Sequence, residues 1–139
     1  MVERILVLCT GNSCRSQMAH GYLRAYFPSA EVYSAGVVAH GVNPLAVMVM
    51  EEDGIDIAHH TSNTIDEYVN LQFDLVITVC DHAREACPVL PGATRVLHRD
   101  FPDPSRLKGP TAEVLPAYRA TRDAIKTYVA GLAQDQFIS

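Results

Sequence analysis

The sequence contains no apolar run long enough to cross a lipid bilayer. Its N-terminus also lacks the charged-then-apolar pattern of a signal peptide, because the apolar residues after Arg4 soon give way to a polar loop. A basic excess is missing as well, since 11 Lys and Arg stand against 16 Asp and Glu, for a net charge of −5. These absences argue against a membrane or a nucleic acid as the main partner, and we expect a cytoplasmic protein.

Cysteine pairs at the usual spacing of a zinc site are also missing. None of the four cysteines is separated from another by two residues, and the six histidines are scattered, so we expect no metal centre. Thiols in a reducing compartment are more often catalytic or redox-active than part of structural disulfides. With 139 residues, of which 48% are apolar, the chain suits a single domain spanning residues 1–139.

Strand-like and helix-like segments alternate along the chain. The predicted strands cover residues 5–9, 31–35, 73–79 and 94–98, and the predicted helices cover residues 15–27, 45–53, 64–69, 82–86 and 111–134. Thr111 is the expected N-cap of the last helix, with Pro116 near its first turn. This order predicts an α/β fold, a small four-stranded parallel sheet with helices on both faces. Because ligands bind at the carboxyl ends of parallel strands, Cys9 and Cys80 are expected at one edge of the sheet.

The loop between the first strand and the first helix carries the clearest chemistry. Backbone N–H groups in such a loop can surround an oxyanion, and Gly11 and Asn12 tolerate the left-handed backbone that this requires. Cys9 is then expected to be a thiolate, and the planar guanidinium of Arg15 suits a tetrahedral oxyanion. Ser16 could donate a hydrogen bond to the thiolate. The loop therefore predicts a nucleophilic cysteine acting on a phosphate-like substrate.

The run Cys-Thr-Gly-Asn-Ser-Cys-Arg-Ser at residues 9–16 resembles the signature loop of the low-molecular-weight protein tyrosine phosphatases. With the Gln-Met-Ala that follows, it is more similar to the thioredoxin-coupled arsenate reductases, which share that fold. The similarity extends through most of the chain, including residues 33–36 and 54–57. It implies a phosphate-binding loop after the first strand. The residues expected to bind substrate are Thr10, Gly11, Asn12, Ser13, Cys14, Arg15 and Ser16.

The resemblance also implies a three-cysteine relay that reduces arsenate to arsenite in arsenic detoxification. Cys9 would be the nucleophile, Cys80 and Cys87 the resolving cysteines, and thioredoxin the source of electrons, with no other cofactor. Asp103, which precedes Pro104, matches the general acid of both families, and Arg15 is expected to stabilise charge. Cys14 is expected to be a packed structural thiol.

Some reductases of this type bind potassium beside the loop through Asn, Glu, Ser, Thr and Asp. The matching positions here are Asn12, His20, Ser34, Thr61 and Asn63. Both carboxylates are thus replaced, by His20 and by Asn63. Because hard cations prefer anionic oxygen ligands, we expect little or no potassium dependence.

Two other functions remain open at this point. A phosphatase would hydrolyse a phosphocysteine intermediate and would not need Cys80 or Cys87 for turnover. An oxyanion or redox sensor would bind its ligand without multiple turnover. The reductant could also be a glutaredoxin instead of thioredoxin, and we expect the protein to be a monomer.

Overall fold

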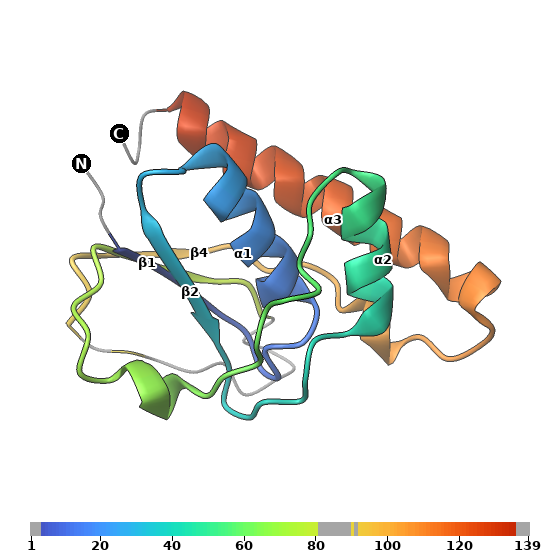
Figure 1. The fold of residues 1–139 in the computed structure, drawn as a ribbon, viewed down its shortest axis with the longest axis horizontal. Helices are drawn as coiled ribbons and strands as arrows, with labels where there is room; N and C mark the ends of the chain where they lie inside the picture. Colours follow the sequence, from blue (N-terminus) through green and yellow to red (C-terminus); the bar gives the residue numbers. More distant parts are fainter. Residues whose placement is uncertain (1–3, 81–89, 91, 136–139) are drawn as a thin grey trace.

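The computed structural model describes residues 4–80, 90 and 92–135. Four strands form one parallel sheet in the order β2-β1-β3-β4, as the alternation of segments predicts (Figure 1). The strands are β1 (Arg4–Leu8), β2 (Glu31–Ala35), β3 (Leu75–Thr78) and β4 (Arg95–His98). The apolar run of β1 is buried on both faces, which is typical of a central strand in a parallel sheet.

The strands end level with one another, and this positions the site. Leu8 pairs with Ala35 on one side and with Thr78 on the other, and Thr78 pairs in turn with His98. The segments that follow the four strands therefore leave the sheet at the same edge. Ligand sites of open parallel sheets lie at this edge.

In the described part of the chain, three α-helices pack together on one face of the sheet (Figure 1). They are α1 (Arg15–Tyr26), α2 (Pro44–Glu52) and α3 (Thr111–Gln134). Met18 and Tyr22 of α1 and Ile125 of α3 join Ile5 and Val7 of β1 in the larger buried cluster. The opposite face is covered by the short 3-10 helix η1 (Ile65–Tyr68) and its neighbours, which pack on Leu6, Leu8 and Val76.

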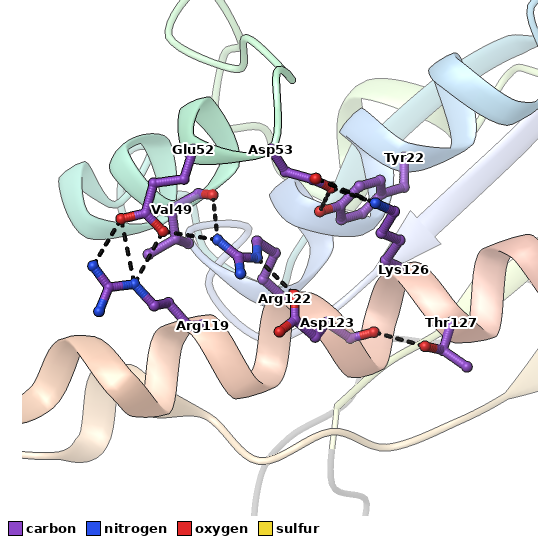
Figure 2. Close-up of polar contacts among 9 residues, drawn as sticks. All are labelled: Tyr22, Val49, Glu52, Asp53, Arg119, Arg122, Asp123, Lys126 and Thr127. Carbon is purple, nitrogen blue, oxygen red and sulfur yellow. Dashed lines mark hydrogen bonds and ion pairs between the residues drawn. The ribbon is translucent and has the colours of Figure 1, made fainter.

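Salt bridges and hydrogen bonds join the end of α2 to the other two helices (Figure 2). Arg122 of α3 donates to Glu52 at 2.9 Å. Asp53, the C-cap of α2, accepts from the Tyr22 hydroxyl at 2.8 Å and lies 2.9 Å from the Lys126 ammonium group. The C-terminal end of α2 is thus fixed to both α1 and α3.

The structure differs from the sequence-based expectation for several helices. Thr111 is the first residue of α3 and not its cap, which is Pro110. Pro116 lies inside α3 on its exposed side and does not delay the start, since the buried residues Val114 and Tyr118 hold this stretch on the core. The segment predicted as helix at residues 64–69 is the 3-10 helix η1, and the helix predicted at residues 82–86 lies outside the described residues.

Within the described part of the chain, no helix combines the length and the apolar character needed to cross a membrane.

Candidate active site

A cavity of about 230 Å³ opens at the carboxyl edge of the sheet, next to the loop at residues 9–16. It brings most of this loop together with Asp103, which is 88 residues from Arg15 in the sequence. The residues that line it are Cys9, Thr10, Gly11, Ser13, Cys14, Arg15, His40, Asp103, Ser105 and Arg106. The sequence-based prediction of an oxyanion loop and the predicted acid thus fall on one cavity.

The carbonyl groups of the loop are held on the outside by two segments. Residues 37–43 donate backbone N–H bonds to three of them. These bonds run from Val37 to Thr10 at 2.9 Å, from Val38 to Thr10 at 3.2 Å, from His40 to Gly11 at 3.0 Å and from Asn43 to Ser13 at 2.9 Å. The Asn12 carbonyl accepts instead from the Ser62 hydroxyl at 2.8 Å and from the Gln17 side-chain amide at 3.1 Å.

Each of these carbonyl groups shares a peptide bond with an N–H group of the next residue. These N–H groups can bind an anion. Among the described residues, no carbonyl accepts a hydrogen bond from the N–H groups of Gly11, Asn12, Ser13 or Cys14. The peptide bonds described are all trans, so each N–H points away from the carbonyl of its own peptide group. Asn12 has a φ of 46°, the left-handed conformation expected for this loop. With the N-terminus of α1 directly behind, these donors have the arrangement that an oxyanion site requires.

The Cys9 thiol is buried and free, and it donates to the Ser16 hydroxyl at 2.9 Å. The Asn12 side-chain amide donates to the same Ser16 oxygen at 2.8 Å. Because Ser16 accepts from Asn12, its own proton is available for a thiolate at Cys9. The contact expected between Ser16 and Cys9 is therefore present, and Asn12 orients it.

Arg15 lies between the loop and the residues after β4. Its side chain is only 3% exposed, and its two terminal nitrogens face the Phe101 carbonyl and the Asp103 carboxylate, each at 3.4 Å. The guanidinium is thus fixed at the cavity by one neutral and one charged acceptor. A bound oxyanion would compete with Asp103 for this charge.

Cys14 also lines the cavity, but its thiol is buried. Burial, together with the nearby charge of Asp103, raises the pKa of this thiol far above its usual range. A thiol in such surroundings stays protonated and is a poor nucleophile. This environment agrees with a packed structural thiol.

The five positions matched to the potassium ligands lie behind the loop, and each contacts another protein group. Asn63 donates from its backbone to the Asn12 side chain at 2.7 Å and accepts from the Thr61 hydroxyl at 2.8 Å. His20 Nδ1 lies 2.8 Å from the Ser34 hydroxyl. In the described residues, no cluster of three or more His, Cys, Asp or Glu side chains is arranged to hold a metal ion.

His20 also stacks against His60, with 4.3 Å between the ring centroids. Burial is the main cause that lowers the pKa of His20, to about 3, and the nearby His60 lowers it further. Burial likewise lowers the pKa of His60 to about 4, with His59 and Arg24 adding to the effect. Two uncharged imidazoles therefore lie behind the loop at neutral pH.

Cys80 follows β3 at the edge where Cys9 follows β1. Both side chains are buried in the same apolar cluster, although Cys80 does not line the cavity. Cys80 is disulfide-bonded, whereas Cys9 and Cys14 are free. Cys87, the second predicted resolving cysteine, lies outside the described residues.

Three residues of the cavity were not among the predicted site residues: His40, Ser105 and Arg106. For Ser105 and Arg106 the sequence does carry a signal. Asp103-Pro104 begins a short turn, the 3-10 helix η2 (Pro104–Arg106), and such a turn brings the next side chains back toward the aspartate. His40 lies in an irregular loop, and nothing in its local sequence indicates a place beside Gly11.

Comparisons with known proteins agree with this geometry. Residues 4–137 match the family model for low molecular weight phosphotyrosine protein phosphatase. An arsenate reductase of Halalkalibacterium halodurans is 46% identical over 131 residues, which cover 94% of each chain. An arsenate reductase solved in its phosphate-binding state superposes with a TM-score of 0.74 and 29% identity, covering 96% of this chain and 98% of the other.

A third relative supports the fold alone. Vibrio vulnificus Wzb, solved in complex with benzylphosphonate, has a TM-score of 0.79 at 22% identity and covers 97% of this chain and 99% of its own. The chain therefore belongs to the low molecular weight phosphotyrosine protein phosphatase family, and to the arsenate reductases within it. The sequence-based expectations of the fold and of this family are confirmed.

Proposed function

We propose that the chain reduces arsenate to arsenite through a thiol relay that begins at Cys9 and is recycled by thioredoxin in the cytoplasm. The observation that carries this proposal is a buried, free Cys9 thiol at an oxyanion site. The 46% identity to an arsenate reductase supports arsenate as the oxyanion. Cys80 supports a relay because it lies at the end of the adjacent strand, in the same buried cluster as Cys9.

The first step joins sulfur to arsenic. The Cys9 thiolate attacks dihydrogen arsenate, Asp103 gives its proton to the departing oxygen, and one water leaves. The products are a monoanionic Cys9–arsenic adduct, water and the Asp103 carboxylate, so atoms and charge balance. Arg15 and the loop N–H groups hold the oxygens on which charge accumulates.

The next steps transfer electrons. Once thioredoxin has reduced the disulfide that holds Cys80 in this structure, the Cys80 thiolate attacks the Cys9 sulfur, and the electron pair of the sulfur–arsenic bond goes to arsenic, which leaves as arsenite. This creates a Cys9–Cys80 disulfide. The Cys87 thiolate then attacks Cys80 and releases Cys9 as a thiolate. A reduced thioredoxin dithiol would reduce the remaining disulfide and become oxidised itself.

Arsenate-dependent NADPH oxidation, with thioredoxin and thioredoxin reductase present, tests the proposal. We expect multiple turnovers with the unaltered chain, and one arsenite per enzyme at most with Cys80→Ser or Cys87→Ser. A phosphatase would instead hydrolyse an aryl phosphate at the same rate in all three proteins. A sensor would bind arsenate without turnover. Replacing thioredoxin by a glutaredoxin system identifies the reductant.

We also propose that this turnover does not depend on potassium. The candidate ligands contact one another or other protein groups, and His20 and Asn63 bring no negative charge to the position. Exchanging potassium for a bulky organic cation at constant ionic strength should leave kcat and KM unchanged. A rise in kcat with potassium would contradict this.

A further inference from the structure

The two oxygens of the Asp103 carboxylate have different partners. Oδ1 accepts two hydrogen bonds from Ser105, one from its hydroxyl at 2.6 Å and one from its backbone N–H at 3.0 Å. Oδ2 has longer contacts, with the Arg15 Nη2 at 3.4 Å and with the Arg106 Nε at 3.9 Å. The neutral donors thus hold one oxygen, and the cations face the other.

This difference decides where a proton can be carried. A protonated carboxyl group has one O–H donor, and the oxygen that bears it no longer accepts two short hydrogen bonds. Oδ1 is already the acceptor of two short Ser105 hydrogen bonds, whereas the contacts of Oδ2 with Arg15 and Arg106, at 3.4 and 3.9 Å, are longer and leave that oxygen room to carry the proton. Oδ2 also lies on the side of Arg15, which lines the cavity with Cys9.

We propose that Ser105 is a positioning residue that fixes the Asp103 carboxyl group and leaves Oδ2 as the oxygen that donates the proton. The inference rests on the proposed function, since it requires Asp103 to act as an acid. Ser105 acts through Asp103: its hydroxyl prevents rotation of the carboxyl group, so the proton on Oδ2 stays aimed at the oxygen that leaves arsenic as water. No other step of the relay changes.

The local structure makes Ser105 suitable for this role. Asp103 is the N-cap of η2 and Pro104 fixes the next φ, so the Ser105 hydroxyl needs to reach back only two residues. Ser105 is exposed and carries no part of the core. Its side chain can therefore be changed without loss of the fold.

The test compares Ser105→Ala with Ser105→Thr, which keeps the hydroxyl, alone and in an Asp103→Asn background. The readout is the single-turnover rate of arsenite formation with pre-reduced enzyme in excess over arsenate, as a function of enzyme concentration. We expect Ser105→Ala to lower the saturating rate about tenfold, with half-saturation changed less than about twofold. Ser105→Thr should stay near the unaltered rate, and Ser105→Ala should add nothing in the Asp103→Asn background.

Each failure has a different reading. If the unaltered chain forms no arsenite, or if Asp103→Asn is as fast as the unaltered chain, the proposed function or the role of Asp103 is wrong. If Asp103→Asn is slow but Ser105→Ala is as fast as the unaltered chain, the Ser105 proposal alone is wrong. The proposal is also overturned if Ser105→Ala slows Asp103→Asn as much as it slows the unaltered chain, because Ser105 would then act independently of Asp103.

Discussion

Cys9 Sγ and Ser16 Oγ lie 2.9 Å apart inside the core, at opposite ends of the oxyanion loop. The pair is not isolated, because Asn12 donates to Ser16 and its side-chain oxygen accepts from the Asn63 backbone at 2.7 Å. A chain of hydrogen bonds thus connects Cys9, the proposed nucleophile, to the polar layer behind the loop. Asn12 is therefore in a position to influence both the backbone of the loop and the hydrogen bond between Cys9 and Ser16.

Ser16→Ala is expected to slow the reaction of Cys9 at neutral pH, because the thiolate loses a charge-assisted hydrogen bond. Alkylation of Cys9 by iodoacetamide at pH 7 should become about tenfold slower. The measurement is the time course of labelling of the Cys9 peptide by mass spectrometry. Labelling in 8 M urea is the control and should be equal for both proteins. Equal rates in the folded state would contradict this role for Ser16.

Short-range patterns explain why the fold could be predicted. The apolar run of β1 and the Asn43–Pro44 start of α2 are local signals, and Asn43 caps α2 by accepting from two N–H groups. The error at the start of α3 shows the limit of such signals. Thr111 is a good cap by type, but packing of Val114 and Tyr118 decides where the helix begins.

The site was only partly predictable, for a similar reason. The chemistry of the loop at residues 9–16 is a prediction from local sequence. The bonds that shape the loop come from residues 37–43 and 61–63, and a loop without periodicity gives no indication of its partners. The contact between Ser105 and Asp103 is local, but its meaning depends on Arg15, which the fold brings from 88 residues away.

Gly36→Ala is expected to disturb the oxyanion loop from behind. A Cβ at this position would lie 2.6 Å from the Thr10 carbonyl oxygen and 2.8 Å from the Asn12 nitrogen, and backbone atoms cannot yield as a side chain can. The free energy of unfolding should fall by about 1–3 kcal/mol, and the affinity for arsenate should weaken. Urea unfolding and an arsenate titration measure the two effects.

Gly131→Ala is the matched control for that substitution. Gly131 lies within α3, and a Cβ there would meet no atom within 4 Å. Alanine should therefore raise the free energy of unfolding by about 1 kcal/mol, through helix propensity, without changing arsenate binding. If both glycine variants bound arsenate as the unaltered chain does, the close approach of Gly36 to the loop would have no role in the site.

Cys14→Ala is expected to leave arsenate turnover near the unaltered rate. The thiol is buried and its pKa is raised, mainly by burial, so it stays protonated while Cys9 reacts. The small cavity left by the lost sulfur should lower the free energy of unfolding by about 1 kcal/mol. Steady-state turnover with thioredoxin measures the first effect, and Cys9→Ala provides the inactive reference. A loss of turnover in Cys14→Ala as complete as in Cys9→Ala would make Cys14 part of the relay.

Arg122→Met and Arg119→Met should differ strongly, although both arginines contact Glu52 (Figure 2). The Arg122 side chain is 13% exposed and also donates to the Val49 carbonyl at 2.8 Å, whereas Arg119 is 44% exposed. Losing Arg122 should lower the free energy of unfolding by about 1–3 kcal/mol, because the part-buried Val49 carbonyl loses its donor. Losing Arg119 should change it by less than about 0.5 kcal/mol. Equal losses in urea unfolding would contradict this ranking.

Acid should destabilise the fold between pH 6.5 and 5 through His20 and His60. Their pKa values are lowered to about 3 and about 4, so the folded protein binds no proton at either ring in this range. The unfolded chain titrates near 6.5 and does bind protons, so stability is present above pH 6.5 and falls as pH decreases. Each ring contributes a slope of at most about 1.4 kcal/mol per pH unit.

His20→Asn tests this directly, since an asparagine amide can replace the ring nitrogen that faces Ser34 at 2.8 Å. The free energy of unfolding is measured in urea at several pH values from 5 to 7. Its dependence on pH should be less steep in this variant, by at most about 1.4 kcal/mol per pH unit, which is the slope from one titrating group. Gly131→Ala, which changes no titratable group, is the control and should keep the slope of the unaltered chain. An unchanged slope in His20→Asn would mean that His20 is not held neutral behind the loop.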